Sequence, residues 1–444
     1  MSTAFPIDFE KRVINDPFLG EDLLNALNTI PPVSVRLHPR KVKPTLDELR
    51  KVSWCEDAVY LKERPIFTLD PLFHAGCYYP QEAGSMVLQH LLKQIDLKED
   101  PMVLDLCAAP GGKSTLIASF LENRGVIVSN EIISSRARIL KENMTKWGYT
   151  NTMVTNNDPA DFERLPHFFD LIVVDAPCSG EGMFRKDINS RNEWSQANVD
   201  NCALRQKQIV EDVWDALKPG GLLIYSTCTF NEQENEENVK WITAELDAEL
   251  VEIDLPQELI PGRNGIGAYC IPGKTESEGF YLALIQKGEG NVQRTRFTRK
   301  KEFRREKDTK GLQEFVHLNG IQVINWNVQL IAIPESQEDN MLHVQAQMRI
   351  VKMGTFLGEY TRKGLLPNEE LALNPFLLNF SNRVELDHNQ ALRFLHGDTF
   401  QLNISNGYQL ATYSGQPLGW LKQVGNRFNN LYPKEWRIRM NIPQ

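Results

Sequence analysis

Residues 171–179, Leu-Ile-Val-Val-Asp-Ala-Pro-Cys-Ser, and residues 222–229, Leu-Leu-Ile-Tyr-Ser-Thr-Cys-Thr, decide the fold. Each segment places a cysteine, Cys178 or Cys228, just after an apolar run that predicts a buried strand. About fifty residues separate the two cysteines, which is enough for one crossover helix, and strands joined by a crossover lie parallel. If these strands are neighbours, both thiols and Asp175 share the crevice where open α/β sheets bind ligands.

Further apolar runs bounded by Gly, Pro or Asp extend this pattern. They predict strands at residues 102–106, 126–131, 152–157 and 279–285. Residues 135–147 repeat apolar side chains at helical spacing, and Gly148 follows as a helix-ending residue. Asn231 with Glu234 three residues later resembles a capping box that opens another helix. Strands alternating with helices predict a doubly wound α/β sheet.

Composition excludes several classes of protein. The chain has 444 residues, of which 41% are hydrophobic, so it is long enough for two or three domains with real cores. No apolar run approaches a membrane span, and the first residues do not resemble a signal peptide. Seven single cysteines without a CxxC pair argue against a zinc site or a disulfide framework, and they fit a reducing cytoplasm.

Charge and texture divide the chain into four expected parts: residues 1–85, 86–289, a linker at 290–312, and a mixed α+β or small barrel region at 313–444. Residues 291–444 carry 20 Lys and Arg against 14 Asp and Glu, whereas residues 1–290 carry 29 against 44. Much of this excess lies in one basic run, which is either a solvated linker or an arm that contacts phosphates. The run comprises Arg294, Arg296, Arg299, Lys300, Lys301, Arg304, Arg305, Lys307 and Lys310.

The loop Asp105-Leu-Cys-Ala-Ala-Pro-Gly-Gly-Lys113 follows one predicted strand and opens a helix. Its end matches a phosphate-binding P-loop, but Cys107 stands where that motif needs its first glycine, and Pro110 would remove a backbone donor. A nucleoside-binding loop fits better. Glu131 at the end of the next strand is placed to bind ribose hydroxyls, and Asp158 after the following strand could accept from an adenine amino group. The alternative is that Glu131 is solvated and Asp158 caps a helix.

Asp175, Cys178 and Cys228 together supply a set of groups that pyrimidine chemistry requires. A thiolate that adds to C6 of a pyrimidine makes C5 nucleophilic toward an electrophilic methyl group. A carboxylate can bind N3 and the exocyclic amine of cytosine, and a further group must assist release. Packing as a small hydrophobe is the expected role of the other cysteines, Cys55, Cys77, Cys107, Cys202 and Cys270.

Several motifs, in order over residues 30–287, resemble those of the Nop/Sun family of RNA cytosine-C5 methyltransferases. They are residues 73–86, the loop 105–113, residues 175–182, and residues 218–230, with Arg136 and Asn143 fitting as well. The resemblance implies a seven-stranded Rossmann-like methyltransferase sheet, with Cys228 as nucleophile, Cys178 assisting release and Asp175 holding the base. DNA cytosine methyltransferases lack the second cysteine, so the pair favours RNA.

The resemblance also implies that S-adenosylmethionine is the cofactor. Its expected contacts are Cys107, Ala108, Ala109, Pro110, Gly111, Gly112, Lys113, Glu131, Asp158 and Asp175. No metal is expected.

Residues 391–397 and 417–439 resemble the C-terminal region of RsmF-type enzymes, which modify small-subunit ribosomal RNA and end in a PUA-like domain. Aromatic residues there interleave with cations, which predicts either base stacking or a small core with a charged rim. They are Trp420, Phe428, Tyr432 and Trp436, with Lys422, Arg427, Lys434, Arg437 and Arg439.

The N-terminal part is expected to bind RNA as well, although Arg36-Leu-His38-Pro39 departs from the family pattern. The expected substrate is thus small-subunit ribosomal RNA, with transfer RNA or a non-catalytic ribosome-assembly role as alternatives. A cytoplasmic monomer that binds neither DNA nor membranes is expected.

Overall fold

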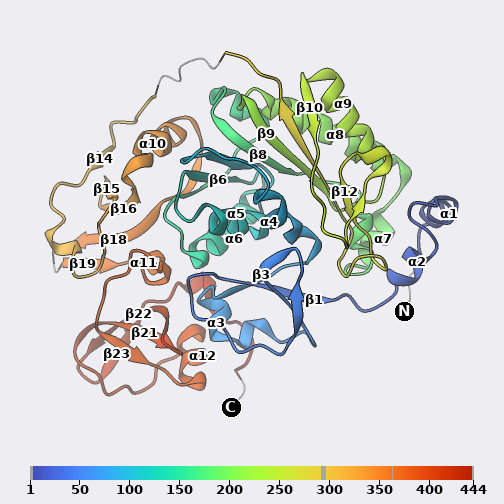
Figure 1. Ribbon diagram of the computed structural model, residues 1–444. Coiled ribbons are helices and arrows are strands. Elements are labelled where there is room, and N and C mark those ends of the chain that lie inside the picture. The colour runs from blue at the N-terminus through green and yellow to red at the C-terminus, as the bar shows by residue number, and fades with distance from the viewer. Residues whose placement is uncertain (1–3, 292–296, 363, 443–444) are drawn as a thin grey trace.

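The computed structural model describes residues 4–291, 297–362 and 364–442. A long twisted sheet with helices on both faces occupies the centre, as Figure 1 shows. A small N-terminal sheet lies below it, and two C-terminal sheets lie along one side. The doubly wound α/β fold predicted for the catalytic region is confirmed.

The central sheet has ten strands in the order β11-β12-β13-β9-β8-β5-β6-β7-β17, with β10 paired to β13. Strands β5 to β9 are parallel neighbours. At one side β13 pairs antiparallel with β9, and β10 and β12 pair antiparallel with β13; at the other side β17 pairs antiparallel with β7. The strands are β5 (Met102–Asp105), β6 (Val126–Asn130), β7 (Thr152–Thr155), β8 (Phe169–Asp175), β9 (Leu217–Thr227), β10 (Ala248–Val251), β11 (Ile260–Pro261), β12 (Ala268–Cys270), β13 (Phe280–Lys287) and β17 (Ile350–Met353).

Alternating side chains of the central strands enter two different cores. In β8, Leu171 and Val173 pack on one face, whereas Ile172 and Val174 pack on the other. The first face is covered by α4 (Val87–Leu92), α5 (Gly112–Leu121) and α6 (Ser134–Trp147). The second is covered by α8 (Gln196–Trp214), α9 (Glu236–Glu245) and α10 (Glu338–Gln347). Because both faces are covered, the middle residues of these parallel strands are apolar, as in Val126–Val128 and Leu171–Val174.

The sheet is wider than the seven strands that the resemblance implied. β11 and β12 extend one edge, and β17 extends the other by pairing with β7. β17 and α10 come from residues predicted to lie in the C-terminal region, so that region contributes to the catalytic sheet. Residues 303–305, placed in the predicted linker, form β14 (Phe303–Arg305) and pair with β15.

The basic run at 294–310 is partly neutralised. Arg299 and Arg305 both pair with the buried carboxylate of Glu338, at 3.1 and 2.5 Å. Arg294 and Arg296 lie outside the described residues. The run is therefore not a simple solvated linker, since part of it is tied to α10.

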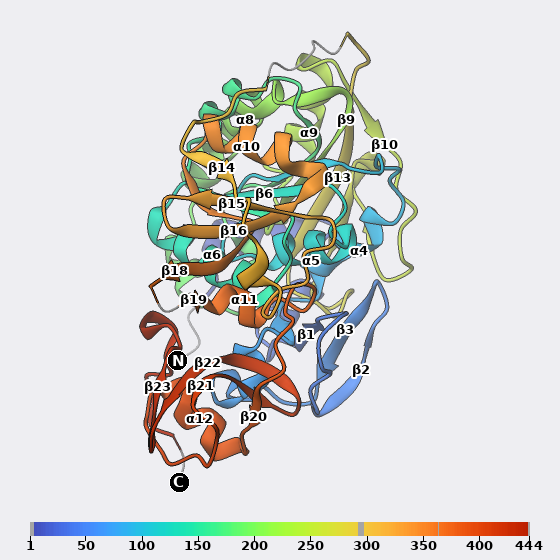
Figure 2. The ribbon, with the colours of Figure 1, turned by 90° about the vertical axis from the view of Figure 1, so that its left-hand side faces the viewer.

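Two small sheets form the C-terminal region (Figure 2). One contains β14, β15 (Ile321–Trp326), β16 (Gln329–Pro334), β18 (Thr355–Thr361) and β19 (Gly364–Pro367). The other contains β20 (Arg383–Glu385), β21 (Gly407–Tyr413), β22 (Gln416–Val424) and β23 (Arg427–Asn430), with α12 (His388–His396) against it. Helix α11 (Glu369–Leu373) connects the two.

The aromatic residues of the tail mostly form this core. Trp420, Phe428 and Tyr432 are buried, and only Trp436 is partly exposed. The prediction of a base-stacking surface is therefore wrong for those three side chains, because they supply the apolar volume that so small a domain needs. Arg427, Lys434 and Arg439 remain exposed around them.

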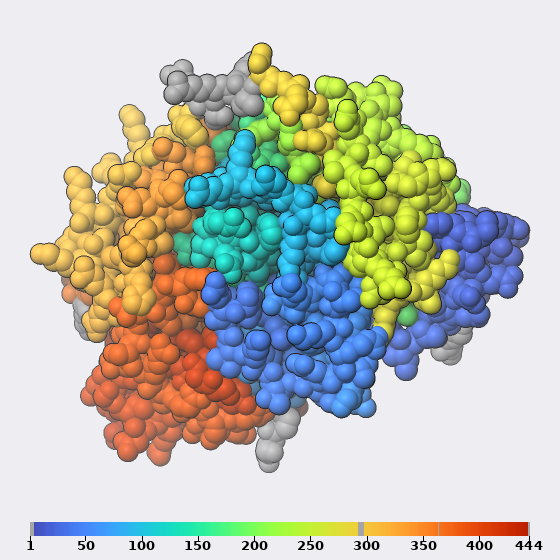
Figure 3. Space-filling view, viewed as in Figure 1, coloured from blue at the N-terminus to red at the C-terminus, as the bar shows by residue number. Residues whose placement is uncertain are grey.

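The N-terminal sheet shares its core with the C-terminal domain. It contains β1 (Val33–Leu37), β2 (Glu48–Val52), β3 (Cys55–Leu61) and β4 (Tyr78–Pro80), with α3 (Pro71–His74) beside it. Helices α1 (Ile7–Asn15) and α2 (Asp22–Ala26) pack instead against the core of the central sheet. Val35 and Leu61 join one apolar cluster with Leu392 and Leu418. Figure 3 shows the blue N-terminal residues directly against the orange and red C-terminal ones.

The basic cluster at residues 36–41 is largely buried rather than available to RNA. Arg36 is 1% exposed and donates to the Gln81 Oε1, the Gly112 carbonyl and the Thr115 hydroxyl. His38 bonds to the Trp147 carbonyl, and Lys41 donates to two carbonyls. Arg36 thus fastens the N-terminal sheet to the first turn of α5.

Among the described residues, no helix is long and apolar enough to cross a membrane.

We predict that Arg36→Ala lowers the free energy of unfolding by about 2–4 kcal/mol, because it leaves buried acceptors without a donor. Arg40→Ala is the matched control. Arg40 pairs with Glu122 at the surface, so its loss should cost about 0.5 kcal/mol or less. Urea unfolding measures both, and equal effects would contradict the fastening role of Arg36.

Candidate functional site

The two predicted cysteines meet at the carboxyl ends of β8 and β9. These strands are parallel neighbours with Asp175 opposite Ser226, and the Sγ atoms of Cys178 and Cys228 lie 2.9 Å apart. The hydrogen bond to Cys228, together with burial, raises the pKa of Cys178 well above its ordinary value. This raised pKa favours the protonated form of Cys178, whose sulfur also accepts from the Cys228 N–H at 3.3 Å.

A glycine allows the two loops to approach this closely. The Gly182 N–H donates to the Cys228 carbonyl at 2.9 Å, and a Cβ at Gly182 would lie 2.8 Å from that oxygen. Any larger residue would push the two cysteine loops apart.

Asp175 is oriented by two neighbours. Lys113 pairs with its Oδ2 at 2.7 Å, and the Ser226 hydroxyl donates to its Oδ1 at 2.9 Å. Burial disfavours the Lys113 ammonium, but Asp175 outweighs this and raises the pKa of Lys113 overall. Lys113 also interacts electrostatically with Cys228. One cation thus serves the carboxylate and the thiol pair together.

The loop at 105–113 is held by its neighbours along its length. Gly111 has φ +115° at the start of α5, a conformation that favours glycine. The Ala108 N–H donates to the Asn130 carbonyl, and Arg136 and Asn143 from α6 donate to the carbonyls of residues 109 and 110. Most polar groups of the loop are therefore fixed before any ligand enters.

Asp105 is the exception within that loop. Its Oδ2 accepts from Ser114 at 2.6 Å, but its Oδ1 is buried without a hydrogen-bond partner among the described residues. Burial raises the pKa of Asp105 to about 7. A buried acceptor without a donor is costly, so this oxygen indicates a place for a ligand donor.

A cavity of about 190 Å³ opens in front of this loop. From the loop it is lined by Asp105, Cys107, Ala108, Ala109, Pro110, Gly112 and Lys113, and Asp175 lies beside them. The other side is lined by Tyr79, Pro80, Gln81, Glu82, Ser85 and Lys186. This cavity fits a cofactor that carries both an ammonium and a carboxylate. It offers the unpaired Oδ1 of Asp105 as an acceptor, the backbone of the loop, and the opposite charges of Lys113 and Asp175.

Glu131 and Asp158 do not line that cavity. Glu131 is 3% exposed, and it accepts from the Ile133 N–H at 2.8 Å and pairs with Arg136 at 3.3 Å. Asp158 is exposed and caps the short helix η3 (Pro159–Arg164), which agrees with the alternative prediction that it caps a helix. Both still follow successive strands, β6 and β7, on the same edge of the sheet.

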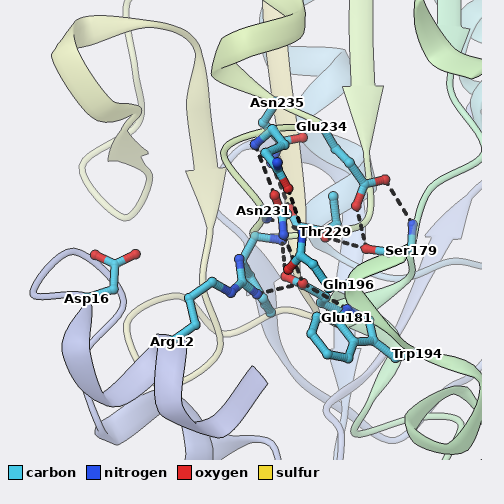
Figure 4. Close-up of polar contacts among 12 residues, drawn as sticks. Arg12, Asp16, Ser179, Glu181, Trp194, Gln196, Thr229, Asn231, Glu234 and Asn235 are labelled. Carbon is cyan, nitrogen blue, oxygen red and sulfur yellow. Dashed lines mark hydrogen bonds and ion pairs between the residues drawn. The ribbon is translucent and has the colours of Figure 1, made fainter. Parts of the chain in front are cut away.

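Sequence reasoning assigned Glu234 to the wrong role. It does not form a capping box, because α9 begins at Glu236 with no side-chain cap. Its carboxylate instead accepts from the Ser179 N–H at 2.9 Å and the Ser179 hydroxyl at 2.5 Å (Figure 4). It also accepts from Gln206 at 2.8 Å. Burial raises the pKa of Glu234 to about 7. Glu234 thus anchors the residue next to Cys178.

Glu181 anchors the second cysteine loop from the other side. It is fully buried and accepts from Arg12 of α1 at 2.6 Å and from the Trp194 indole at 3.0 Å (Figure 4). It also accepts from the Phe230 N–H at 3.2 Å. Phe230 lies two residues after Cys228. The role of Glu181 was missed, although it stands within the quoted motif 175–182, because spacing does not reveal which acid is buried.

Cys55, Cys77, Cys202 and Cys270 are buried, which confirms their expected packing role. Cys107 is partly exposed and lies in the cavity wall, while also packing against the core.

Three family models match the chain. They are described as 16S rRNA methyltransferase RsmB/F (residues 92–286), the N-terminal domain of 16S rRNA methyltransferase RsmF (residues 8–83) and the methyltransferase RsmF PUA domain (residues 381–438). Residues 1–7, 84–91, 287–380 and 439–444 lie outside these matches.

Similar proteins agree with these models. Ribosomal RNA small subunit methyltransferase F of Aeromonas salmonicida is 32% identical over 91% of this chain and 88% of its own. The protein of the same name from Pectobacterium atrosepticum is 30% identical over 91% and 87%. The structure of NSun6 from Pyrococcus horikoshii with SFG has a TM-score of 0.56 at 22% identity, covering 65% of this chain and 99% of its own, so it shares the fold.

We predict that Glu234→Gln flattens the pH dependence of stability. The folded-state pKa of Glu234 is about 7, above an unfolded value of about 4.3, so the folded protein holds a proton that the unfolded chain releases between these values. Stability therefore falls as pH rises through this window, and Asp105 contributes in the same direction. Urea unfolding at pH 5 and pH 8 should show a smaller difference for the variant. Glu237→Gln, an exposed neighbour, should leave the difference unchanged.

Proposed function

Because this chain belongs to the RsmF family of small-subunit ribosomal RNA methyltransferases, we propose that it methylates C5 of one specific cytosine in that RNA. The observation that carries the proposal is the 2.9 Å contact between Cys178 and Cys228 beside Asp175. No simpler transfer to an oxygen or nitrogen atom needs two thiols and a carboxylate at one point.

S-adenosylmethionine is the cofactor of this class of enzyme. When bound, it supplies a methyl group that is electrophilic. We infer that the loop Cys107–Lys113 with Asp105 and Asp175 holds it, with Glu131 and Asp158 at the neighbouring strand ends. The orphan Oδ1 of Asp105 and the Lys113–Asp175 pair supply an acceptor and opposite charges for its amino-acid part.

Cys228 is the proposed nucleophile. The Lys113 ammonium interacts electrostatically with Cys228, and the Cys178 sulfur lies 2.9 Å away, so both groups are placed to activate the attacking sulfur. Its electron pair forms the bond to C6, and the electrons of the C5–C6 double bond become available at C5 for methylation. Glu181 holds the loop after Cys228, so the sulfur is positioned before the base arrives.

Asp175 is the proposed partner of the cytosine ring. Its carboxylate lies at the end of β8, held by Lys113 and Ser226, next to both sulfurs. A carboxyl group there can hydrogen-bond N3 and the exocyclic amine, which stabilises the ring as charge develops on it. Uracil lacks that amine, so the same contact favours cytosine.

Cys178 is proposed to assist release. The hydrogen bond to Cys228 is the largest cause of its raised pKa, and that bond is lost once the Cys228 sulfur is joined to C6. Cys178 then gives up its proton to solvent more readily, and its thiolate can take the proton from methylated C5. The electrons of that C–H bond restore the double bond, and the S–C6 bond breaks with its pair returning to Cys228.

We predict opposite outcomes for the two cysteines. Cys228→Ala should lower methyl transfer to RNA by at least about 1,000-fold and form no covalent complex. Cys178→Ala should form the complex but not resolve it, so a protein–RNA band should persist in a denaturing gel. Labelled methyl incorporation and that gel measure both.

Cys202→Ala on α8 is the matched control and should keep nearly full activity with no trapped band. Full activity of Cys228→Ala would show that the proposed mechanism is wrong. A band trapped by Cys228→Ala rather than Cys178→Ala would exchange the two roles.

We predict that deleting the gene removes the bisulfite protection of one cytosine in small-subunit RNA. Sequencing of bisulfite-treated total RNA from cells with and without the gene measures this. Loss of protection at a cytosine of transfer RNA instead would support the proposed chemistry and show that the proposed substrate is wrong. No change at any cytosine would favour a non-catalytic assembly role.

A further inference from the structure

We propose that a second cavity, between the edge strand β17 and the sheet β14–β15–β16, binds one unpaired nucleotide of the RNA substrate. The cavity has a volume of about 410 Å³, which is large enough for a base with its sugar. It lies among residues 141–370, most of them in the segment 287–380 that no family model matches. The proposal rests on the proposed function only in taking RNA as the substrate.

The cavity is far from the thiol pair. Strand β17 lies four strands from β8 in the order β8-β5-β6-β7-β17, which is about 19 Å at the usual spacing of strands. The backbone of Arg349, at the cavity wall, is fixed by two hydrogen bonds: its carbonyl accepts from the Asn156 N–H, and its N–H donates to the Asn157 Oδ1, just before Asp158. The two sites therefore share one edge of the sheet without overlapping.

An aromatic pair forms one wall. Phe303 of β14 and Trp326 of β15 stack with ring centroids 5.2 Å apart and planes at 19°. Trp326 is 38% exposed, although it is a large apolar side chain. A stacked pair that ends at an open cavity can be extended by one more flat ring, and unpaired RNA bases are commonly bound this way.

A buried glutamine supplies the polar contact. Gln345 of α10 lines the cavity and is 5% exposed, and its Oε1 has no hydrogen-bond partner among the described residues. An orphan acceptor at this depth is unfavourable in the free protein, so it indicates a ligand that brings an N–H group. Every base presents such a group on its Watson–Crick edge.

The charge of the lining suits a phosphate backbone. Four cations, Lys141, Lys300, Arg349 and Lys352, stand against two carboxylates, Glu302 and Glu370. Lys352 and Glu370 pair with each other at 2.8 Å. Lys300 and Arg349 are exposed, and their side chains have no carboxylate partner within the described ranges. Two cations are thus left for phosphates, which favours RNA over an extended peptide added to the β17 edge.

The test uses the full-length Cys228→Ala protein, which should bind RNA without forming an adduct. The variant Gln345→Met keeps the shape of the side chain and removes the orphan acceptor. We expect it to weaken the binding of a single-stranded RNA oligonucleotide about tenfold, while leaving the melting temperature unchanged or raised. Trp326→Leu should weaken binding by a similar factor. Lys300→Gln should lower the slope of log affinity against log salt by about one.

Matched controls come from the same elements. Gln347→Met on α10 and Tyr360→Leu on β18 lie outside the cavity lining and should not change the affinity. Photo-crosslinking of a 4-thiouridine oligonucleotide, mapped by mass spectrometry, should mark peptides that contain Phe303 or Trp326. These binding readouts are independent of methyl transfer, so a protein that failed to methylate cytosine could still pass this test.

Unchanged RNA affinity in Gln345→Met and Trp326→Leu, without crosslinks at the cavity, would overturn the proposal. Binding of free AMP that responds to Gln345→Met, with no effect on the oligonucleotide, would assign the cavity to a free nucleotide and overturn the RNA assignment. Crosslinking of a peptide, but not of RNA, would do the same in favour of strand addition at β17.

Discussion

The parallel pairing of β8 with β9 is the constraint on which the site depends. It puts Asp175 level with Ser226, so the two loops that leave these strands begin at the same height. Cys178 and Cys228 each follow after two or three further residues, and their sulfurs meet at 2.9 Å. A shift of register by one residue would separate them by a strand step of about 3.3 Å, which exceeds the tolerance of a hydrogen bond.

Buried acids stabilise that arrangement at some cost. Glu234 and Glu181 are out of water, and each is compensated by several donors from different elements. Burying a carboxylate is unfavourable unless such donors are present, so these residues specify the loop positions more than they stabilise the fold. The sulfurs themselves are small and apolar and could not hold their own loops in place.

The local sequence pattern was sufficient to predict the parallel strands of the sheet and to select Cys178 and Cys228 as the candidate catalytic cysteines. Short apolar runs marked β5 to β9 because buried parallel strands must be apolar on both faces, and loops after strands marked Cys178 and Cys228. The sequence patterns gave wrong predictions where segments distant in the chain determine the surroundings of a side chain. Glu234 has the spacing of a cap but binds Ser179, Arg36 is basic but buried, and Trp420 is aromatic but internal. The added strand β17 was unpredictable because its partner β7 lies about two hundred residues earlier.

The core shared by the first and last domains has a consequence for synthesis of the chain. Val35 and Leu61 pack in one cluster with Leu392 and Leu418, which are synthesised more than three hundred residues later. At about 5–20 residues per second, the ribosome exposes one apolar face of the N-terminal sheet for roughly 15–65 s before its cover exists. During that interval the nascent chain exposes apolar surface, as aggregation-prone folding intermediates do. The need for chaperones should therefore depend on the number of residues between these two domains in the sequence rather than on the stability of either domain.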